Sequence, residues 1–278
     1  MATKKAASIK KKAPVVHHVT ASSSSKSSVT TAPALVKRQS FGNHIESALQ
    51  SVSLWRAVAA EFLGTFLLAA TVIAGQGQPI FLLFALTGIV LIFGGISGAH
   101  VNPAITLGAW ATRRIGWLRA IGYVLAQFLG AAVAYFTLNA FVGGAPALTE
   151  AQQAYGQSAP SLYAAVDIAT VAGREWYVFF AEVLGTTVLA FAIAHALRAK
   201  EALTAAFTAG LGIFIALMFV VTIAGYISAS SFINPAVALA LQAFTPSGWA
   251  YLVYALAPIV GGVIGFVLYD IWRGKATN

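Results

Sequence analysis

The tripeptide Asn-Pro-Ala occurs twice in the sequence, at Asn102-Pro103-Ala104 and at Asn234-Pro235-Ala236. An Asn followed by Pro suits the start of a helix, because the Asn side chain can cap the helix and Pro needs no N–H in the first turn. Each Asn could act purely as a cap, or it could cap with its oxygen while its NH₂ group faces a lumen. Carboxamide donors and the positive ends of two helix dipoles would then orient water oxygens and repel cations.

Two glutamates, Glu61 and Glu182, lie inside strongly apolar segments. A carboxylate in such a setting is costly and is a functional candidate. One interpretation is a proton relay in a coupled carrier, and the other is a structural acceptor of hydrogen bonds from irregular backbone beside a half-helix. Their matching positions favour the structural interpretation, because a relay needs no symmetric pair and few other charges are present to continue it.

His100 lies two residues before Asn102. It could titrate, line the cytoplasmic mouth of a pore, or pack the loop through hydrogen bonds, and lining or packing is the better supported role. The sequence has no Cys, no phosphate-cradling Gly loop and no His/Glu cluster suited to catalysis. It therefore predicts no catalytic residue, no metal site and no cofactor, and the protein is not expected to be an enzyme.

The elements that must position these residues are membrane helices. The chain is 59% hydrophobic and 9% charged, whereas a soluble domain carries about 25% charged residues. The sequence predicts an all-α membrane protein with six transmembrane helices, at about residues 54–74, 79–96, 115–141, 175–197, 203–227 and 248–272. Two shorter stretches, 102–112 and 234–244, each open with Asn-Pro-Ala and are expected to be re-entrant half-helices.

Positive charge is concentrated in one region and on one side. Eight of the 17 Lys and Arg residues lie in the first 38 positions, so the net charge of +9 does not indicate a nucleic-acid partner. Residues 1–50 are expected to form a disordered, basic, Ser/Lys-rich tail, which an anionic leaflet could attract. Six spans place both termini on one side, and of the remaining Lys and Arg only Arg174 falls opposite. We therefore expect cytoplasmic termini at the plasma (inner) membrane and an extracytoplasmic segment 143–174.

The chain is an internal repeat of residues 51–142 and 175–278, the second ending in a short cytoplasmic C-terminus. The segment Ala60–Thr65 resembles Ala181–Thr186, and the third spans share the pattern Tyr-x-Leu-Ala. Each half holds three spans, with a half-helix between the second and the third. Because three is odd, the second half must insert upside down, so the half-helices enter from opposite faces and can meet near the midplane.

With these residues in hand, the chain resembles the aquaporin (major intrinsic protein) family over residues 54–272. The segment Ser97–Leu107 is similar to the family signature, and two Asn-Pro-Ala copies with two Glu-anchored spans in register are far more specific than one. The resemblance implies a right-handed bundle, a pore in each subunit and a homotetramer in the lipid bilayer. It also implies passage of water and, in one branch, of glycerol and other small neutral solutes.

The filter departs from the family pattern. The family usually has Arg directly after the second Asn-Pro-Ala, and this sequence has Val237. Counting from the two sites without gaps assigns the other three filter positions to Leu82, Thr222 and Ser231. The resemblance then implies a neutral, more apolar and widened filter, unless Arg174 or side-chain bulk restores the constriction. Ser230 stands where the family normally has Gly.

These observations predict a passive channel for water and small neutral solutes. The alternatives are a proton- or ion-coupled carrier that uses Glu61 and Glu182, and a non-conducting structural membrane protein of the same fold. A coupled carrier predicts saturable uptake driven by a pH gradient, whereas a channel predicts non-saturating flux.

Overall fold

The computed structural model describes residues 41–274, and every regular element in this part of the chain is helical. Six helices are long and apolar enough to cross a membrane, which confirms the predicted number of spans. They are α2 (Val52–Ala74), α3 (Pro79–Ser97), α5 (Trp117–Gly143), α7 (Glu175–Ala196), α8 (Ala202–Gly225) and a sixth span over Gly248–Arg273. The half-helices are α4 (Pro103–Ala111) and α9 (Pro235–Ala240), and α9 ends earlier than the expected residue 244.

The expectation of a disordered tail up to residue 50 is wrong at its end. Residues Phe41–Leu49 form helix α1, which leads directly into α2. The indole N–H of Trp55 donates to the carbonyl of Leu49 at 2.7 Å and closes the junction between the two helices. The rest of the predicted tail, residues 1–40, lies outside the described residues.

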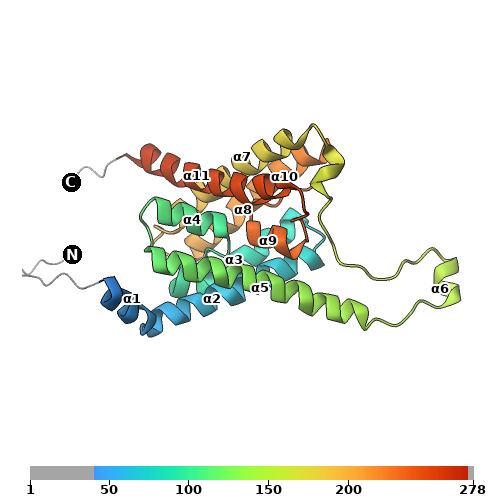
Figure 1. Cartoon of the computed structure of the whole chain (residues 1–278), viewed down its shortest axis with the longest axis horizontal. Coiled ribbons are helices and arrows are strands. Elements are labelled where there is room, and N and C mark those ends of the chain that lie inside the picture. The colour runs from blue at the N-terminus through green and yellow to red at the C-terminus, as the bar shows by residue number, and fades with distance from the viewer. Residues whose placement is uncertain (1–40, 275–278) are drawn as a thin grey trace, which may run out of the picture. The chain divides into compact units, whose positions relative to one another are not determined.

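The two halves pack in equivalent ways (Figure 1). Helix α2 packs on α3 and α5, and in the second half α7 packs on α8 and α11 (Ala257–Arg273). Each half-helix packs mainly on the third span of the other half, α4 on α11 and α9 on α5, although α4 also contacts α5. This exchange brings α4 and α9 together in the middle of the bundle, as the inverted repeat predicts.

Close approach of the first and third spans in each half depends on glycine. A Cβ atom on Gly130 would collide with the carbonyl oxygen of Phe62, and one on Gly261 would collide with that of Val183. Backbone atoms cannot move aside as a flexible side chain can. Small residues at such positions let helices in a membrane pack backbone to backbone, where dispersion contacts drive association.

The sixth span changes its helical geometry halfway. It consists of α10 (Gly248–Tyr251), a π-helical turn η2 (Leu252–Leu256) and α11. Pro258 lies at the start of α11 and has no N–H to donate to the preceding turn. The wider π-helical turn before it leaves room for the proline ring where one backbone hydrogen bond is absent, so the span continues through the proline.

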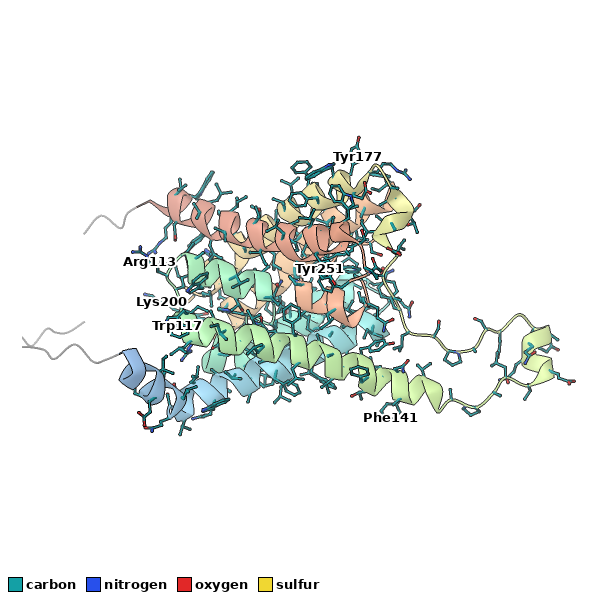
Figure 2. The ribbon with its side chains drawn as sticks, viewed as in Figure 1. Arg113, Trp117, Phe141, Tyr177, Lys200 and Tyr251 are labelled. Atoms are coloured by element: carbon teal, nitrogen blue, oxygen red, sulfur yellow. The ribbon has the colours of Figure 1, made fainter. Side chains whose placement is uncertain are left out.

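The ends of the bundle differ in charge. We call the end near α1, where α3 and α7 finish and α8 begins, the proximal end, and the opposite end, where α2 and α8 finish, the distal end. Figure 2 shows Arg113 and Lys200 at the proximal end.

The connecting segment 144–174 joins the halves and contains α6 (Glu150–Ala154) and the 3₁₀ turn η1 (Ile168–Val171).

Candidate functional site

The asparagines of both Asn-Pro-Ala tripeptides cap the half-helices. The side-chain oxygen of Asn102 accepts from the N–H of Ala104 at 2.9 Å, and that of Asn234 accepts from the N–H of Ala236 at 3.0 Å. Both asparagines are 3% exposed, so the caps lie in the interior of the bundle. Proline occupies the first helical turn after each cap, where its missing N–H costs nothing.

Each asparagine also donates a hydrogen bond to the other half of the molecule. The NH₂ group of Asn102 donates to the carbonyl of Ile233 at 2.9 Å, and that of Asn234 donates to the carbonyl of Val101 at 3.0 Å. A carboxamide nitrogen carries two hydrogens. Within residues 41–274 the second hydrogen of each group has no protein acceptor, so the pair offers two N–H donors in the interior of the bundle.

The carbonyls that accept these bonds belong to residues with a left-handed backbone conformation. Val101 has φ of 43° and Ile233 has φ of 50°, the left-handed region that β-branched residues avoid. Such a conformation costs on the order of 1–3 kcal/mol and persists only where surrounding contacts over-determine it. Here it turns each carbonyl toward the asparagine of the opposite half.

Glu61 supplies one set of these contacts. Its carboxylate accepts from the backbone N–H groups of His100 at 2.9 Å and Val101 at 2.7 Å. It also accepts from the Ser97 hydroxyl at 2.6 Å and from the Gln127 side-chain amide at 2.8 Å. The side chain is fully buried, and these bonds to a carboxylate hold the strained loop before α4.

Glu182 holds the equivalent loop before α9 with one contact fewer. It accepts from the backbone N–H groups of Phe232 and Ile233, the latter at 2.8 Å, and from the Ser231 hydroxyl at 2.9 Å. The position that matches Gln127 in the repeat is Pro258, which has no amide to donate. Both glutamates are therefore placed at the loops, as the structural interpretation expects.

His100 is packed inside the first loop. Its Nδ1 lies 3.2 Å from the Thr106 hydroxyl oxygen, which also accepts from the Gln127 amide at 2.8 Å. Its ring meets the Tyr123 ring edge to face, with centroids 5.5 Å apart. The side chain is 4% exposed and lines neither cavity described below, so of the expected roles the structure favours loop packing.

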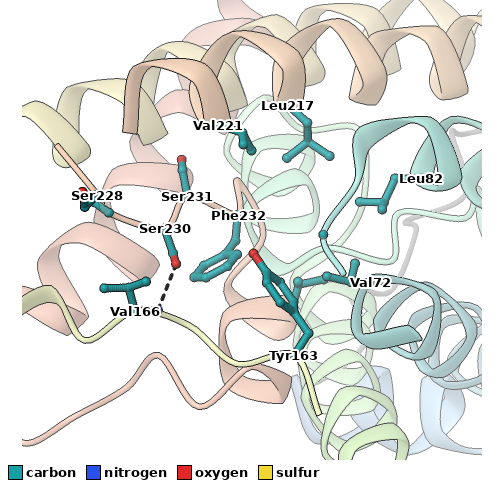
Figure 3. A pocket seen from close by; sticks show the side chains of 13 residues that line it. Val72, Leu82, Tyr163, Val166, Leu217, Val221, Ser228, Ser230, Ser231 and Phe232 are labelled. Atoms are coloured by element: carbon teal, nitrogen blue, oxygen red, sulfur yellow. Dashed lines mark hydrogen bonds between the residues drawn. The ribbon is translucent and has the colours of Figure 1, made fainter. Parts of the chain in front are cut away.

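A cavity of about 320 Å³ opens at the distal end, and we call it the distal cavity (Figure 3). Of the four predicted filter residues, Leu82, Ser231 and Val237 line it. Thr222 does not: its side chain is exposed and its hydroxyl bonds back to the carbonyl of Met218 at 2.6 Å. Leu217 and Val221 line the cavity instead. These two are four residues apart and share a helix face, whereas Thr222 is rotated about 100° away from that face.

The connecting segment contributes residues that sequence reasoning missed. Tyr163 and Val166 line the distal cavity, together with Phe232 from the loop before α9. Arg174, the residue expected to restore a positive constriction, is exposed and is not among the lining residues. The segment has no apolar period and no motif, so no signal in the sequence selects Tyr163.

A second cavity, of about 390 Å³, lies at the proximal end and is called the proximal cavity. Its lining comes from α3 and its C-cap, from the end of α7, from the start of α8 and from the short link between α7 and α8, and includes Val90, Gly94, Gly98, Ile193, Leu197 and Lys200. The two cavities thus lie at opposite ends of the bundle, and neither lining includes Asn102 or Asn234. Among residues 41–274 no three His, Asp or Glu side chains gather closely enough to hold a metal ion.

Comparison with known proteins agrees with this arrangement. The family described as Major intrinsic protein matches residues 47–269. Glycerol uptake facilitator protein-like 6 of Lactiplantibacillus plantarum is 36% identical over 215 residues, which cover 74% of this chain and 92% of that protein. Aquaporin NIP1-1 of Zea mays is 30% identical over 236 residues, which cover 80% of this chain and 77% of that protein.

A solved structure shares the fold. The aquaglyceroporin of Plasmodium falciparum superposes with a TM-score of 0.60 at 22% identity, over 78% of this chain and 96% of that one. The inverted pair of capped half-helices and the matched sequence profile lead to the same conclusion. This chain is an integral membrane protein and belongs to the major intrinsic protein family.

Proposed function

We propose that this protein is a passive channel for water and small neutral solutes such as glycerol, with Asn102 and Asn234 as its central polar point. The observation that carries the proposal is the reciprocal bonding of the two carboxamides, which leaves one N–H on each without a protein acceptor in the described chain. Those donors can bind the oxygen of a passing water or alcohol. The cavities at the two ends supply the approaches.

The names of similar proteins support the solute class. One similar protein is called a glycerol uptake facilitator and another an aquaporin. In this chain Val237 lines the distal cavity where the family usually has Arg, so the wall is neutral there. A neutral, apolar wall lowers the cost of moving an alkyl-bearing solute out of water, because no charged group must be desolvated with it.

The contacts of Glu61 and Glu182 support a channel over a coupled carrier. Each carboxylate accepts two backbone N–H bonds and a serine hydroxyl bond, so its charge is already satisfied. A carrier that protonates these groups in every cycle would break those bonds each time. We therefore assign both glutamates to the support of the pore loops.

Stopped-flow light scattering on proteoliposomes tests the proposal, with water and glycerol gradients applied to one preparation and protein-free liposomes as the control. We expect fast shrinkage in the water gradient and fast re-swelling as glycerol enters. Water flux without glycerol entry would contradict the widened filter. Fluxes equal to those of protein-free liposomes would overturn the channel itself.

We also propose a homotetramer in the plasma (inner) membrane, with both termini in the cytoplasm. The proximal end carries Arg56, Arg113, Arg114, Arg119, Arg198, Lys200 and Arg273, which supports the orientation by the positive-inside rule. Chemical cross-linking in native membranes checks the subunit number. Protease protection of tags in the α6 region and at the C-terminus checks the sidedness.

A further inference from the structure

Tyr163 belongs to the connecting segment, yet its side chain reaches into the distal cavity. Figure 3 shows the ring rising from that segment toward Phe232, with its hydroxyl oxygen among the lining side chains. Gly77, with φ of 68°, lies against it: a Cβ atom on that glycine would lie 2.9 Å from the Tyr163 hydroxyl oxygen. The bare backbone at Gly77 therefore leaves the space that the phenol occupies.

The second half of the chain fixes the segment that carries Tyr163. The N–H of Ala165 donates to the carbonyl of Leu241 at 2.9 Å, just after α9. The N–H of Val166 donates to the Ser230 hydroxyl at 2.9 Å, a bond that glycine at this position would not provide. Because these bonds follow Tyr163 directly, its ring is held by the same loops that build the pore.

Few side-chain hydroxyls line the distal cavity, and two of them are already bonded. The Ser231 hydroxyl donates to Glu182, and the Ser230 hydroxyl accepts from the N–H of Val166. Leu82, Leu217 and Val237 offer only carbon, so Tyr163 and the exposed Ser228 supply the remaining side-chain hydroxyls of the lining. Within residues 41–274 the Tyr163 hydroxyl has no hydrogen-bond partner, so it is free to donate to and accept from a solute. Burial raises the pKa of Tyr163 above its ordinary value of 10.0, which keeps the group a neutral alcohol.

We propose that Tyr163 is a specificity-determining residue of this channel, whose hydroxyl binds one hydroxyl of a short polyol while the carbon chain of that polyol rests on Leu82 and Val237. This inference rests on the proposed function and names the residue that supplies the polar contact where the usual Arg is missing. A solute with hydroxyls along one edge fits such a wall. Its hydroxyls can form hydrogen bonds with Tyr163, while its carbon atoms are removed from water against the apolar side chains.

Tyr163→Phe removes the hydroxyl and keeps the ring, and it is the test variant. One net hydrogen bond lost from the transit of glycerol should lower the ratio of glycerol to water permeability about 3- to 10-fold. Tyr155→Phe is the matched control, because Tyr155 lies in the same segment, is 87% exposed and does not line the distal cavity. Both variants are measured by stopped-flow light scattering against the unmodified protein.

A labelling experiment checks the position of the side chain independently of flux. The chain contains no cysteine, so Tyr163→Cys and Tyr155→Cys each introduce a single thiol. We expect a small cationic methanethiosulfonate reagent to modify both and to block flux only in Tyr163→Cys. Molar glycerol should slow the modification of Tyr163→Cys and leave that of Tyr155→Cys unchanged.

The outcomes separate the two proposals. Conduction in the unmodified protein with an unchanged permeability ratio in Tyr163→Phe would overturn the role of Tyr163 and leave the channel standing. Labelling of Tyr163→Cys without any loss of flux would overturn it as well. Absence of all flux in the unmodified protein would overturn the channel, and Tyr163 would then have no passing solute to select.

Discussion

Glu61 and Glu182 hold equivalent loops in the two halves, although their surroundings differ. Both oxygens of each carboxylate face at least one backbone N–H. A glutamine at either position would therefore point its NH₂ group at an N–H donor whichever way the amide is turned. Glutamine therefore cannot satisfy both N–H groups, because a carboxylate has an acceptor oxygen on each side and a carboxamide has only one.

Glu61→Gln and Glu182→Gln should each lower the free energy of unfolding by about 1–3 kcal/mol, the cost of leaving a buried donor unsatisfied. Glu201→Gln is the control, since Glu201 is exposed at the start of α8. The midpoint of unfolding in detergent, followed by tryptophan fluorescence, gives the comparison. A fully stable Glu61→Gln protein that lost a pH-driven uptake would instead support the coupled carrier.

Val237 leaves the wall of the distal cavity uncharged at the position where the family usually has Arg. Val237→Arg adds a cation and fills space beside Leu82, so we expect glycerol permeability to fall about tenfold, as for a size mismatch in an apolar pocket. Water permeability should fall less. Val237→Met adds length without charge and shows how much of the effect is bulk. Equal glycerol permeability in all three proteins would mean that this position does not limit passage.

At the scale of elements, the contact between the first and third spans is the most demanding. Gly130→Ala and Gly261→Ala each drive a methyl group into a backbone carbonyl of the facing helix. We expect each to cost about 1–3 kcal/mol through overpacking, measured as a lower midpoint of thermal unfolding. Gly88→Ala is the control, because nothing lies within 4 Å of the Cβ it would add. Equal midpoints in all four proteins would refute the close-packing argument.

The helices themselves could be predicted from sequence, whereas the lining of the distal cavity could be predicted only in part. Apolar length defines a span, and Pro after Asn defines a helix start, so α2 to α5 and α7 to α9 follow from local rules. The position of Thr222 comes from counting residues along the sequence from the Asn-Pro-Ala sites. Such a count does not show whether Val221 or Thr222 faces the cavity. Tyr163 is placed by tertiary hydrogen bonds from Ala165 and Val166, for which the sequence carries no local signal.

At the scale of the whole molecule, a channel and a coupled carrier differ in their response to pH. Because burial raises the pKa of Tyr163, its phenol stays neutral in the folded protein throughout the range from pH 6 to pH 9. Any stability it contributes is lost only as the pH rises past its unfolded value of 10.0. The ratio of glycerol to water permeability should therefore be constant from pH 6 to pH 9 in stopped-flow measurements. A steep change of this ratio within that range would contradict a neutral filter.

The reciprocal bonds of Asn102 and Asn234 carry a consequence for biosynthesis. The acceptor of Asn102 is the carbonyl of Ile233, which a ribosome makes 131 residues later. Until that segment arrives, the NH₂ group of Asn102 and the carbonyl of Val101 have no partner, so burying the first half-helix in the bilayer is unfavourable. The first half-helix should therefore enter the bilayer fully only after the second half is made. We expect proteases to cut the loop before α4 in nascent chains that stop short of Glu175 and not in finished ones.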